Sequence, residues 1–157
     1  MATPTTDTDL GWSLGAVMRA YLRAAAQAVA DVPGGPRGHQ VLAATDLGVG
    51  VTQLALAQHV GVDRTVMTYL LDDLERAGLV ERRPDPADRR ARRILLTDAG
   101  DVRLRELEGA LRRAESDLLA PLDPDEQRLL RDLLARLASG TGPANPCQVA
   151  DELGGAC

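Results

Sequence analysis

Four polar side chains that can recognise DNA recur at helical spacing near the middle of the chain. They are Arg64, Thr65, Thr68 and Tyr69, and their spacing places them together on one side of a helix. Arginine can donate two hydrogen bonds to guanine, and threonine can bond a base or pack against the methyl group of thymine. A tyrosine hydroxyl can reach a phosphate. The alternative is an ordinary solvated helix face, so the surrounding elements must decide between the two.

A strip of arginines follows this helix. Between Arg76 and Arg93 the sequence has seven arginines against three acidic residues, which are Glu81, Asp85 and Asp88. This arginine strip therefore carries +4, and because the whole chain is -5, the remainder carries -9. Local positive charge on an acidic protein is typical of a surface that binds DNA phosphates. The alternative is a charged hairpin that only keeps the protein soluble.

The elements that hold these side chains are predicted to form a helix-turn-helix. Thr52 can cap a helix that ends at about Val60, and Gly61 can make the turn after it. Asp63 can then cap a longer helix over 64–77. Two helices separated by a short turn with a glycine are typical of this motif. The inward side of the second helix is predicted to consist of Val66, Met67, Leu70, Leu71 and Leu74.

After Gly78 the pattern changes to that of a β-hairpin. The segments 79–83 and 92–96 are predicted to be short strands, and the segment 84–91 between them is rich in proline and aspartate. Those two residue types exclude a helix and favour turns. A hairpin directly after a helix-turn-helix is known as a wing, and here its tip is highly charged.

Helices with one apolar face flank this region. We predict helices over about 10–31 and 37–45, then one from 98 to about 120 that Thr97 caps. Asp123 and Glu126 have the spacing of a capping box, which starts a last, leucine-rich helix. An apolar seam with alternating spacings of three and four is suited to packing another helix. That seam consists of Leu104, Leu107, Leu111, Ala114 and Leu118.

Composition excludes several other classes. The chain has 157 residues, 45% of them hydrophobic, and all 18 basic residues are arginine. No apolar run is long enough to span a bilayer and the N-terminus is not a signal peptide, so we expect a cytoplasmic protein. Cys147 and Cys157 both lie near the C-terminus and form no zinc or disulfide pattern. His39 and His59 have no evident nucleophile partner, so we expect neither an enzyme nor a cofactor nor a metal site.

The chain resembles the MarR (multiple antibiotic resistance regulator) family of winged-helix transcription factors over roughly residues 10–138. Four motifs carry the resemblance: residues 61–68, residues 74–82, the Asp-Pro-x-Asp-x-Arg pattern of the wing at 85–90, and Leu-Thr-x-x-Gly at 96–100. The last two together are more specific than the helix-turn-helix alone. The resemblance implies a homodimer in which the first helix and the last two helices of each subunit interlock.

The resemblance also implies roles for single residues. Arg90 is expected to enter the minor groove from the wing tip, with Asp88 bracing it. The complete set of expected DNA contacts is Arg64, Thr65, Thr68, Tyr69, Arg89, Arg90 and Arg92. Family members commonly release DNA when a small molecule, often aromatic or anionic, binds near the dimer helices. The side chains that border this expected effector pocket are Met18, Tyr21 and His39. The first helix has no cysteine, so a peroxide-sensing mechanism is not supported.

We therefore expect a mainly α fold with a small β-hairpin wing. Residues 10–45 and 98–138 are expected to form a helical dimerisation region, and residues 46–97 a winged helix-turn-helix lobe that binds DNA. Residues 1–9 and 139–157 are expected to be flexible. The expected partners are a pseudo-palindromic double-stranded operator, a second copy of the chain and an effector, with no membrane. The expected function is a transcriptional regulator, in the first instance a repressor. The alternative is a winged-helix module that binds protein rather than DNA.

Overall fold

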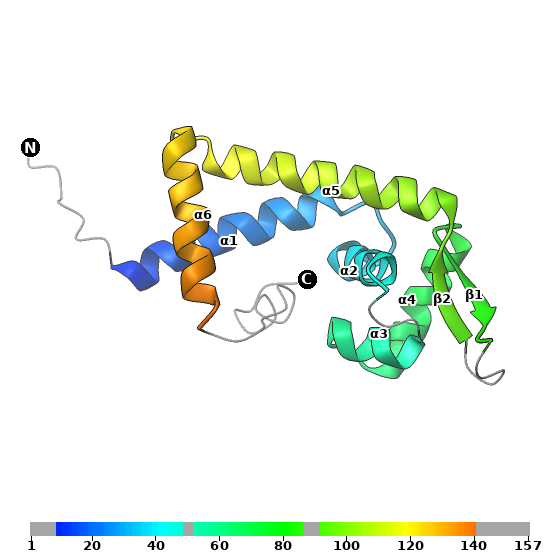
Figure 1. The fold of residues 1–157 in the computed structure, drawn as a ribbon. Coiled ribbons are helices and arrows are strands. Elements are labelled where there is room, and N and C mark those ends of the chain that lie inside the picture. The colour runs from blue at the N-terminus through cyan, green and yellow to red at the C-terminus, as the bar shows by residue number, and fades with distance from the viewer. Residues whose placement is uncertain (1–8, 49–51, 87–91, 141–157) are drawn as a thin grey trace, which may run out of the picture.

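Within the part of the chain that the structure describes, six helices and one two-stranded antiparallel sheet form an elongated fold (Figure 1). The computed structural model describes residues 9–48, 52–86 and 92–140. The elements are, in chain order, α1 (Leu10–Ala28), α2 (Gly35–Asp46), α3 (Gln53–Val60), α4 (Arg64–Arg76), β1 (Val80–Pro84), β2 (Arg92–Leu96), α5 (Asp98–Leu119) and α6 (Pro124–Ala138). The predicted mainly α fold with a hairpin wing is confirmed. Both tails predicted to be flexible lie outside the described residues, apart from residues 9, 139 and 140.

Side-chain caps start four of the helices where the sequence predicts them. The Thr52 hydroxyl accepts a hydrogen bond from the backbone N–H of Ala55, and the Asp63 carboxylate accepts two from the first turn of α4. Thr97 caps α5, and Asp123 forms the predicted capping box at α6. These bonds satisfy N–H groups that have no partner within their own helix. α3 ends at Gly61, whose φ of 75° is the left-handed conformation that glycine adopts without strain.

The first helix is shorter than predicted. α1 ends at Ala28 rather than near residue 31, and the chain continues in turns closed by hydrogen bonds between residues three apart. One of these turns joins the N–H of Val32 to the carbonyl of Val29, and both side chains are buried. Pro33 disfavours helical geometry at the residue before it, so the helix ends before it reaches Val32. The turns then lead directly into α2.

The hydrophobic core lies where α2, α3, α4, the hairpin and the start of α5 meet. Its largest fully buried side chains are Leu42, Leu56, Met67, Leu71, Leu74, Ile94, Leu104 and Leu107. α2 lies against α3, α5 and β2, so it connects the helix-turn-helix to the long helices. The position of the helix-turn-helix relative to α5 therefore depends on α2.

The base of the hairpin is fixed to its neighbours by strand pairing and by hydrogen bonds of one threonine side chain. β1 and β2 pair from Val80 with Leu96 to Pro84 with Arg92, and a further bridge joins Thr52 to Arg93. Thr97 donates its hydroxyl proton to the carbonyl of Gly78 and accepts a hydrogen bond from the N–H of Gly100. The Leu-Thr-x-x-Gly motif thus joins the end of α4, the hairpin and the start of α5 at one point.

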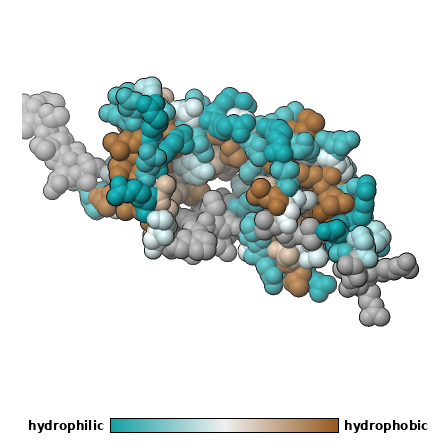
Figure 2. Space-filling model, in the orientation of Figure 1, coloured by the Kyte–Doolittle hydropathy of each residue, from teal (hydrophilic) through white to brown (hydrophobic). Residues whose placement is uncertain are grey.

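The apolar seam of α5 packs within the chain itself. Leu104 and Leu107 are buried in the core, Leu111 packs against it, and α1 lies along α5 (Figure 1). The seam therefore has a partner helix in the same subunit, which its spacing could not specify. α1 and α6 instead have no buried residue and expose large apolar side chains. Part of this brown surface is visible at the α6 end in Figure 2. Among the described residues, no helix is both long and apolar enough to cross a membrane.

Candidate nucleic-acid interface

α4 has one buried side and one solvent side. Met67, Leu70, Leu71 and Leu74 lie in the core. Arg64 and Thr65 are exposed, and Tyr69 has 67% of its surface exposed. Val66 was predicted to point inward, but 40% of its surface is exposed. It lies in the first turn, about 100° around the helix from Met67, so it projects past the edge of the buried side.

Thr68, also on this side of α4, is half-buried and has two hydrogen bonds. Its hydroxyl donates to the carbonyl oxygen of Arg64 at 2.9 Å. It also accepts a hydrogen bond from the side-chain amide of Gln53, whose Nε2 lies 2.6 Å away. Gln53 is the first residue of α3, so this bond links the two helices of the motif. The role of Gln53 was not predicted from the sequence, because the two residues are 15 apart and their contact depends on how the helices cross.

Not every arginine of the strip is free to bind a partner, although the strip as a whole is positively charged. Arg82 binds two acidic side chains of α4, with Nη2 at 2.6 Å from Asp72 Oδ1 and Nη1 on Glu75 Oε2. Its own backbone N–H also donates to Glu75 Oε1 at 3.2 Å. Only 20% of the Arg82 side chain is exposed. Arg82 therefore anchors the wing to α4 and does not face solvent as a free cation.

Three other arginines of the strip also have acidic partners. Ion pairs join Arg76 to Asp73, Arg83 to Glu81, and Arg93 to Asp85. Arg92 is exposed and forms no ion pair with the described part of the chain. The expected contacts Arg89 and Arg90, with the expected brace Asp88, lie outside the described residues.

The expected effector residues lie on α1 and α2, and two of them, Tyr21 and His39, lie near acidic side chains of α5. Burial raises the pKa of the Tyr21 hydroxyl, and the negative charge of Glu115 adds to this effect. Burial lowers the pKa of the His39 imidazole, and Glu108 opposes the change. Glu108 and Glu115 are seven residues apart, or about two helical turns, so Tyr21 and His39 lie along one side of α5. Met18 is partly exposed on α1.

His39 has an unusual environment for a polar ring. Its Nε2 atom is buried and has no hydrogen-bond partner among the described residues. A buried polar atom without a partner is costly, and such atoms often mark a place where a ligand or water binds. The buried ring nitrogen therefore has the capacity to bond a water molecule or a ligand.

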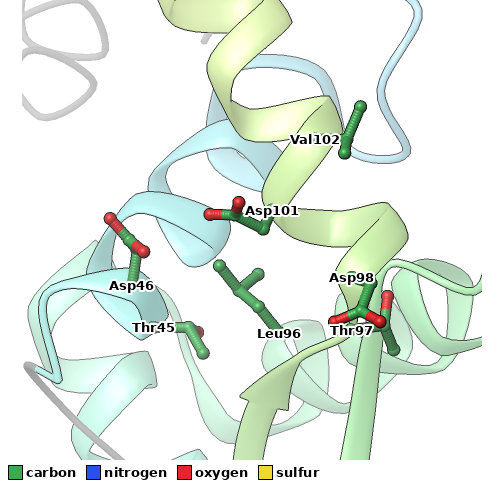
Figure 3. A pocket seen from close by; sticks show the side chains of 7 residues that line it. All are labelled: Thr45, Asp46, Leu96, Thr97, Asp98, Asp101 and Val102. Atoms are coloured by element: carbon green, nitrogen blue, oxygen red, sulfur yellow. The ribbon is translucent and has the colours of Figure 1, made fainter.

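An open pocket of about 450 Å³ lies elsewhere, between α2, β2 and the start of α5 (Figure 3). It is lined by Thr45, Asp46, Leu96, Thr97, Asp98, Asp101 and Val102. Arg105 bonds both Asp46 and Asp101 at 3.1 Å, and the two threonine hydroxyls donate to backbone carbonyls. Most polar groups of the pocket are thus satisfied within the chain. In the described part of the structure, no group of three or more His, Cys, Asp or Glu side chains could hold a metal ion.

Comparison with known proteins identifies the fold. A family model described as MarR family matches residues 36–91. A mutant form of MarR from E. coli is 25% identical with a TM-score of 0.72, over 83% of this chain and 96% of that one.

Two further solved structures show other states of such proteins. The transcriptional repressor CouR, bound to a 23-mer DNA duplex, is 29% identical with a TM-score of 0.66, over 88% of this chain and 98% of that one. The PcaV transcriptional regulator from Streptomyces coelicolor, in complex with its natural ligand, is 29% identical with a TM-score of 0.60, over 90% and 100%. Residues 36–91 thus match the MarR family, and the chain as a whole has the fold and the order of elements of MarR-family winged-helix proteins.

Proposed function

We propose that this protein is a sequence-specific, homodimeric transcriptional repressor that a small molecule releases from its operator. The observation that carries the proposal is the exposed side of α4, which presents Arg64, Thr65 and Tyr69 on a helix that packs against an arginine-rich hairpin. The N-terminal part of such a helix enters the major groove in helix-turn-helix proteins. The CouR structure, described as a repressor on a DNA duplex, supports the same use of this fold.

In this proposal the wing contacts DNA beside the groove that α4 enters. Arg90 enters the minor groove, Asp88 braces it, and Arg89 and Arg92 contact the backbone. Arginine suits this position because the negative potential is strongest in a narrow minor groove. Residues 46–97 are the DNA-binding lobe.

The apolar surfaces of α1 and α6 support dimerisation through residues 10–45 and 98–138. The exposed apolar side chains are Leu10, Trp12, Leu14, Val17 and Met18 on α1, and Leu129, Leu133, Leu134 and Leu137 on α6. Removing apolar surface from water favours association. A two-fold dimer then recognises a pseudo-palindromic operator with half-sites about 10 bp apart.

The effector in this proposal binds beside α5, near Met18, Tyr21 and His39. The buried Nε2 of His39 supports this place, because a ligand could supply the missing hydrogen bond. The PcaV complex shows that a protein with this fold holds a natural ligand. An aromatic or anionic ligand that prefers a dimer unable to span both half-sites weakens DNA binding by that difference in affinity.

Selection from a random duplex library followed by a salt titration tests the proposal. DNA binding through several arginines loses affinity as salt rises, with a log–log slope of about -0.9 for each neutralised phosphate. We expect enrichment of a pseudo-palindrome and a slope steeper than about -4, which corresponds to five or more phosphates. If no duplex is enriched, the alternative of a winged-helix module that binds protein is favoured.

The role of the wing tip can be tested separately. Arg90→Ala should weaken binding to the selected duplex at least about tenfold at fixed salt, because a minor-groove contact is lost. The matched control is Arg112→Ala, which removes an exposed arginine of α5 far from the wing and should change affinity little. Equal affinities of the two variants in fluorescence anisotropy would remove Arg90 from the interface.

A further inference from the structure

The hydrogen bonds of Thr68 restrict what this side chain can recognise. A threonine hydroxyl has one proton to donate and two lone pairs that can accept. The proton is directed to the carbonyl of Arg64, and one lone pair accepts from Gln53 Nε2. The hydroxyl therefore has no proton left for a base. Guanine O6 and N7, adenine N7 and thymine O4 are all acceptors, so Thr68 cannot bond any of them in this arrangement.

The same two bonds fix the orientation of the side chain. Arg64 lies one turn earlier on α4, and Gln53 lies on α3, so both oxygen partners are on the protein side of Thr68. With the oxygen held there, the tetrahedral Cβ atom directs its methyl group away from those partners. A free threonine exchanges between rotamers, but here leaving this rotamer costs two hydrogen bonds.

We propose that Gln53 and Thr68 act as one specificity-determining unit, in which Gln53 holds Thr68 so that its methyl group contacts the 5-methyl group of a thymine. Apolar contact with that methyl group is one of the ways in which a side chain distinguishes thymine in the major groove. Gln53 is thus a positioning residue and Thr68 the residue that touches the base. This inference rests on the proposed DNA binding.

Uracil provides a direct test, because it differs from thymine only by the missing methyl group. The probe is the duplex selected from a random library by the full-length protein, with each thymine replaced in turn by uracil in both half-sites. At one symmetric position we expect the substitution to weaken binding about tenfold, from a loss of about 3- to 4-fold in each half-site.

Variants of the two residues connect that position to this unit. Thr68→Ser keeps the hydroxyl and removes the methyl group. This variant should therefore bind duplexes with uracil and with thymine at that position equally well. Gln53→Ala keeps the methyl group but frees its orientation, so the preference for thymine should shrink. Thr45→Ser is the matched control, because it removes a methyl group from a threonine of α2 whose hydroxyl also donates to the carbonyl four residues earlier, and it should leave the preference at that position intact. Circular dichroism melting confirms that each variant is folded.

The possible outcomes separate this inference from the proposed function. If no duplex is enriched, the proposed DNA binding and the inference both fail. If a duplex is enriched but no thymine position loses its preference in Thr68→Ser, only the inference fails. A preference that disappears in Thr68→Ser but is unchanged in Gln53→Ala refutes the positioning role of Gln53.

Discussion

His39 makes the stability of this protein depend on pH in a defined direction. Burial lowers the pKa of its imidazole in the folded state, while the unfolded chain has a pKa near 6.5. Above that pH the ring is neutral in both states and has no effect. Below it the unfolded state takes up the proton first, so the free energy of unfolding falls until the pH reaches the lowered folded pKa.

We therefore expect the wild type to lose more stability between about pH 7.5 and about pH 5.5 than a His39→Gln variant does. Urea unfolding at the two pH values measures this difference. If the two proteins lose the same amount, burial of His39 does not control its protonation.

At the scale of single residues, the sequence predicts contacts that are local and fails for those that depend on packing. Thr52, Asp63 and Asp123 cap helices by bonding N–H groups two or three residues further on, so their spacing alone predicts them. The bond from Gln53 to Thr68 and the ion pairs of Arg82 join different elements. Their formation depends on helix crossing and hairpin register, which no local pattern contains.

At the scale of elements, Gly100 keeps the junction between the hairpin and α5 closely packed. A Cβ atom at this position would lie 1.9 Å from the carbonyl oxygen of Leu79, which is backbone and cannot rotate away. We expect Gly100→Ala to lower the free energy of unfolding by about 1–3 kcal/mol, or more if the junction cannot adjust.

A second glycine of α5 provides the matched control. A Cβ atom at Gly109 would meet only the ends of flexible arginines, at 3.5 Å or more. Gly109→Ala should therefore stabilise the protein by up to about 1 kcal/mol, because alanine favours a helix. Chemical unfolding of both variants should give opposite signs, and equal signs would contradict the close approach at Gly100.

The attachment of the wing to α4 depends on Arg82. Its replacement by methionine keeps most of the apolar stem but leaves Asp72 and Glu75 without their shared cation. We expect the free energy of unfolding to fall by about 1–2 kcal/mol. This value lies between the small contribution of a surface ion pair and the larger cost of breaking a buried one. The same substitution should also weaken DNA binding, because the hairpin loses its fixed position beside α4.

Arg83→Met is the comparison for this prediction. Arg83 lies on the same strand, and 63% of its side chain is exposed where it pairs with Glu81. The Arg83→Met substitution should lower the free energy of unfolding by at most about 0.5 kcal/mol. If urea unfolding gives equal losses for the two variants, Arg82 is not the anchor of the wing.

The sequence predicts the element boundaries closely, but it does not predict which element covers each apolar face. The strands and the helices α3 to α6 begin within one residue of their predicted starts, because capping residues and glycines mark them. The seam of α5 contains a helix-packing pattern that is the same for any partner, so its burial in the core of the same subunit could not be foreseen. Val66 was misplaced because periodicity gives a direction but not the extent of the covering surface.

At the scale of the whole molecule, α6 is held to the described chain mainly through its first turn and lacks buried side chains. Its contacts include bonds from Gln127 to two carbonyls of the preceding turn and the ion pair of Arg131 with Glu115. In the proposed dimer, the leucines of α6 are covered by the second subunit. The double replacement Leu133→Asp with Leu137→Asp should therefore convert the dimer into a monomer.

Light scattering after size-exclusion chromatography measures this change as a halving of mass. Val102→Asp is the control, because it places the same charge at an exposed apolar position on α5, outside the surfaces of α1 and α6. It should leave the mass unchanged. A dimer that persists in the double variant would show that α6 is not the interface.

The length of α5 has a mechanical consequence. Its 22 residues extend about 33 Å, from the base of the hairpin to the turn before α6 (Figure 1). In a helix of that length, a tilt of about 5° at one end moves the other end by about 3 Å. This displacement is close to the step of about 3.4 Å between base pairs. A ligand that slightly tilts this helix would therefore put the two halves of a dimer out of register with the DNA by about one base pair, without distorting either recognition surface.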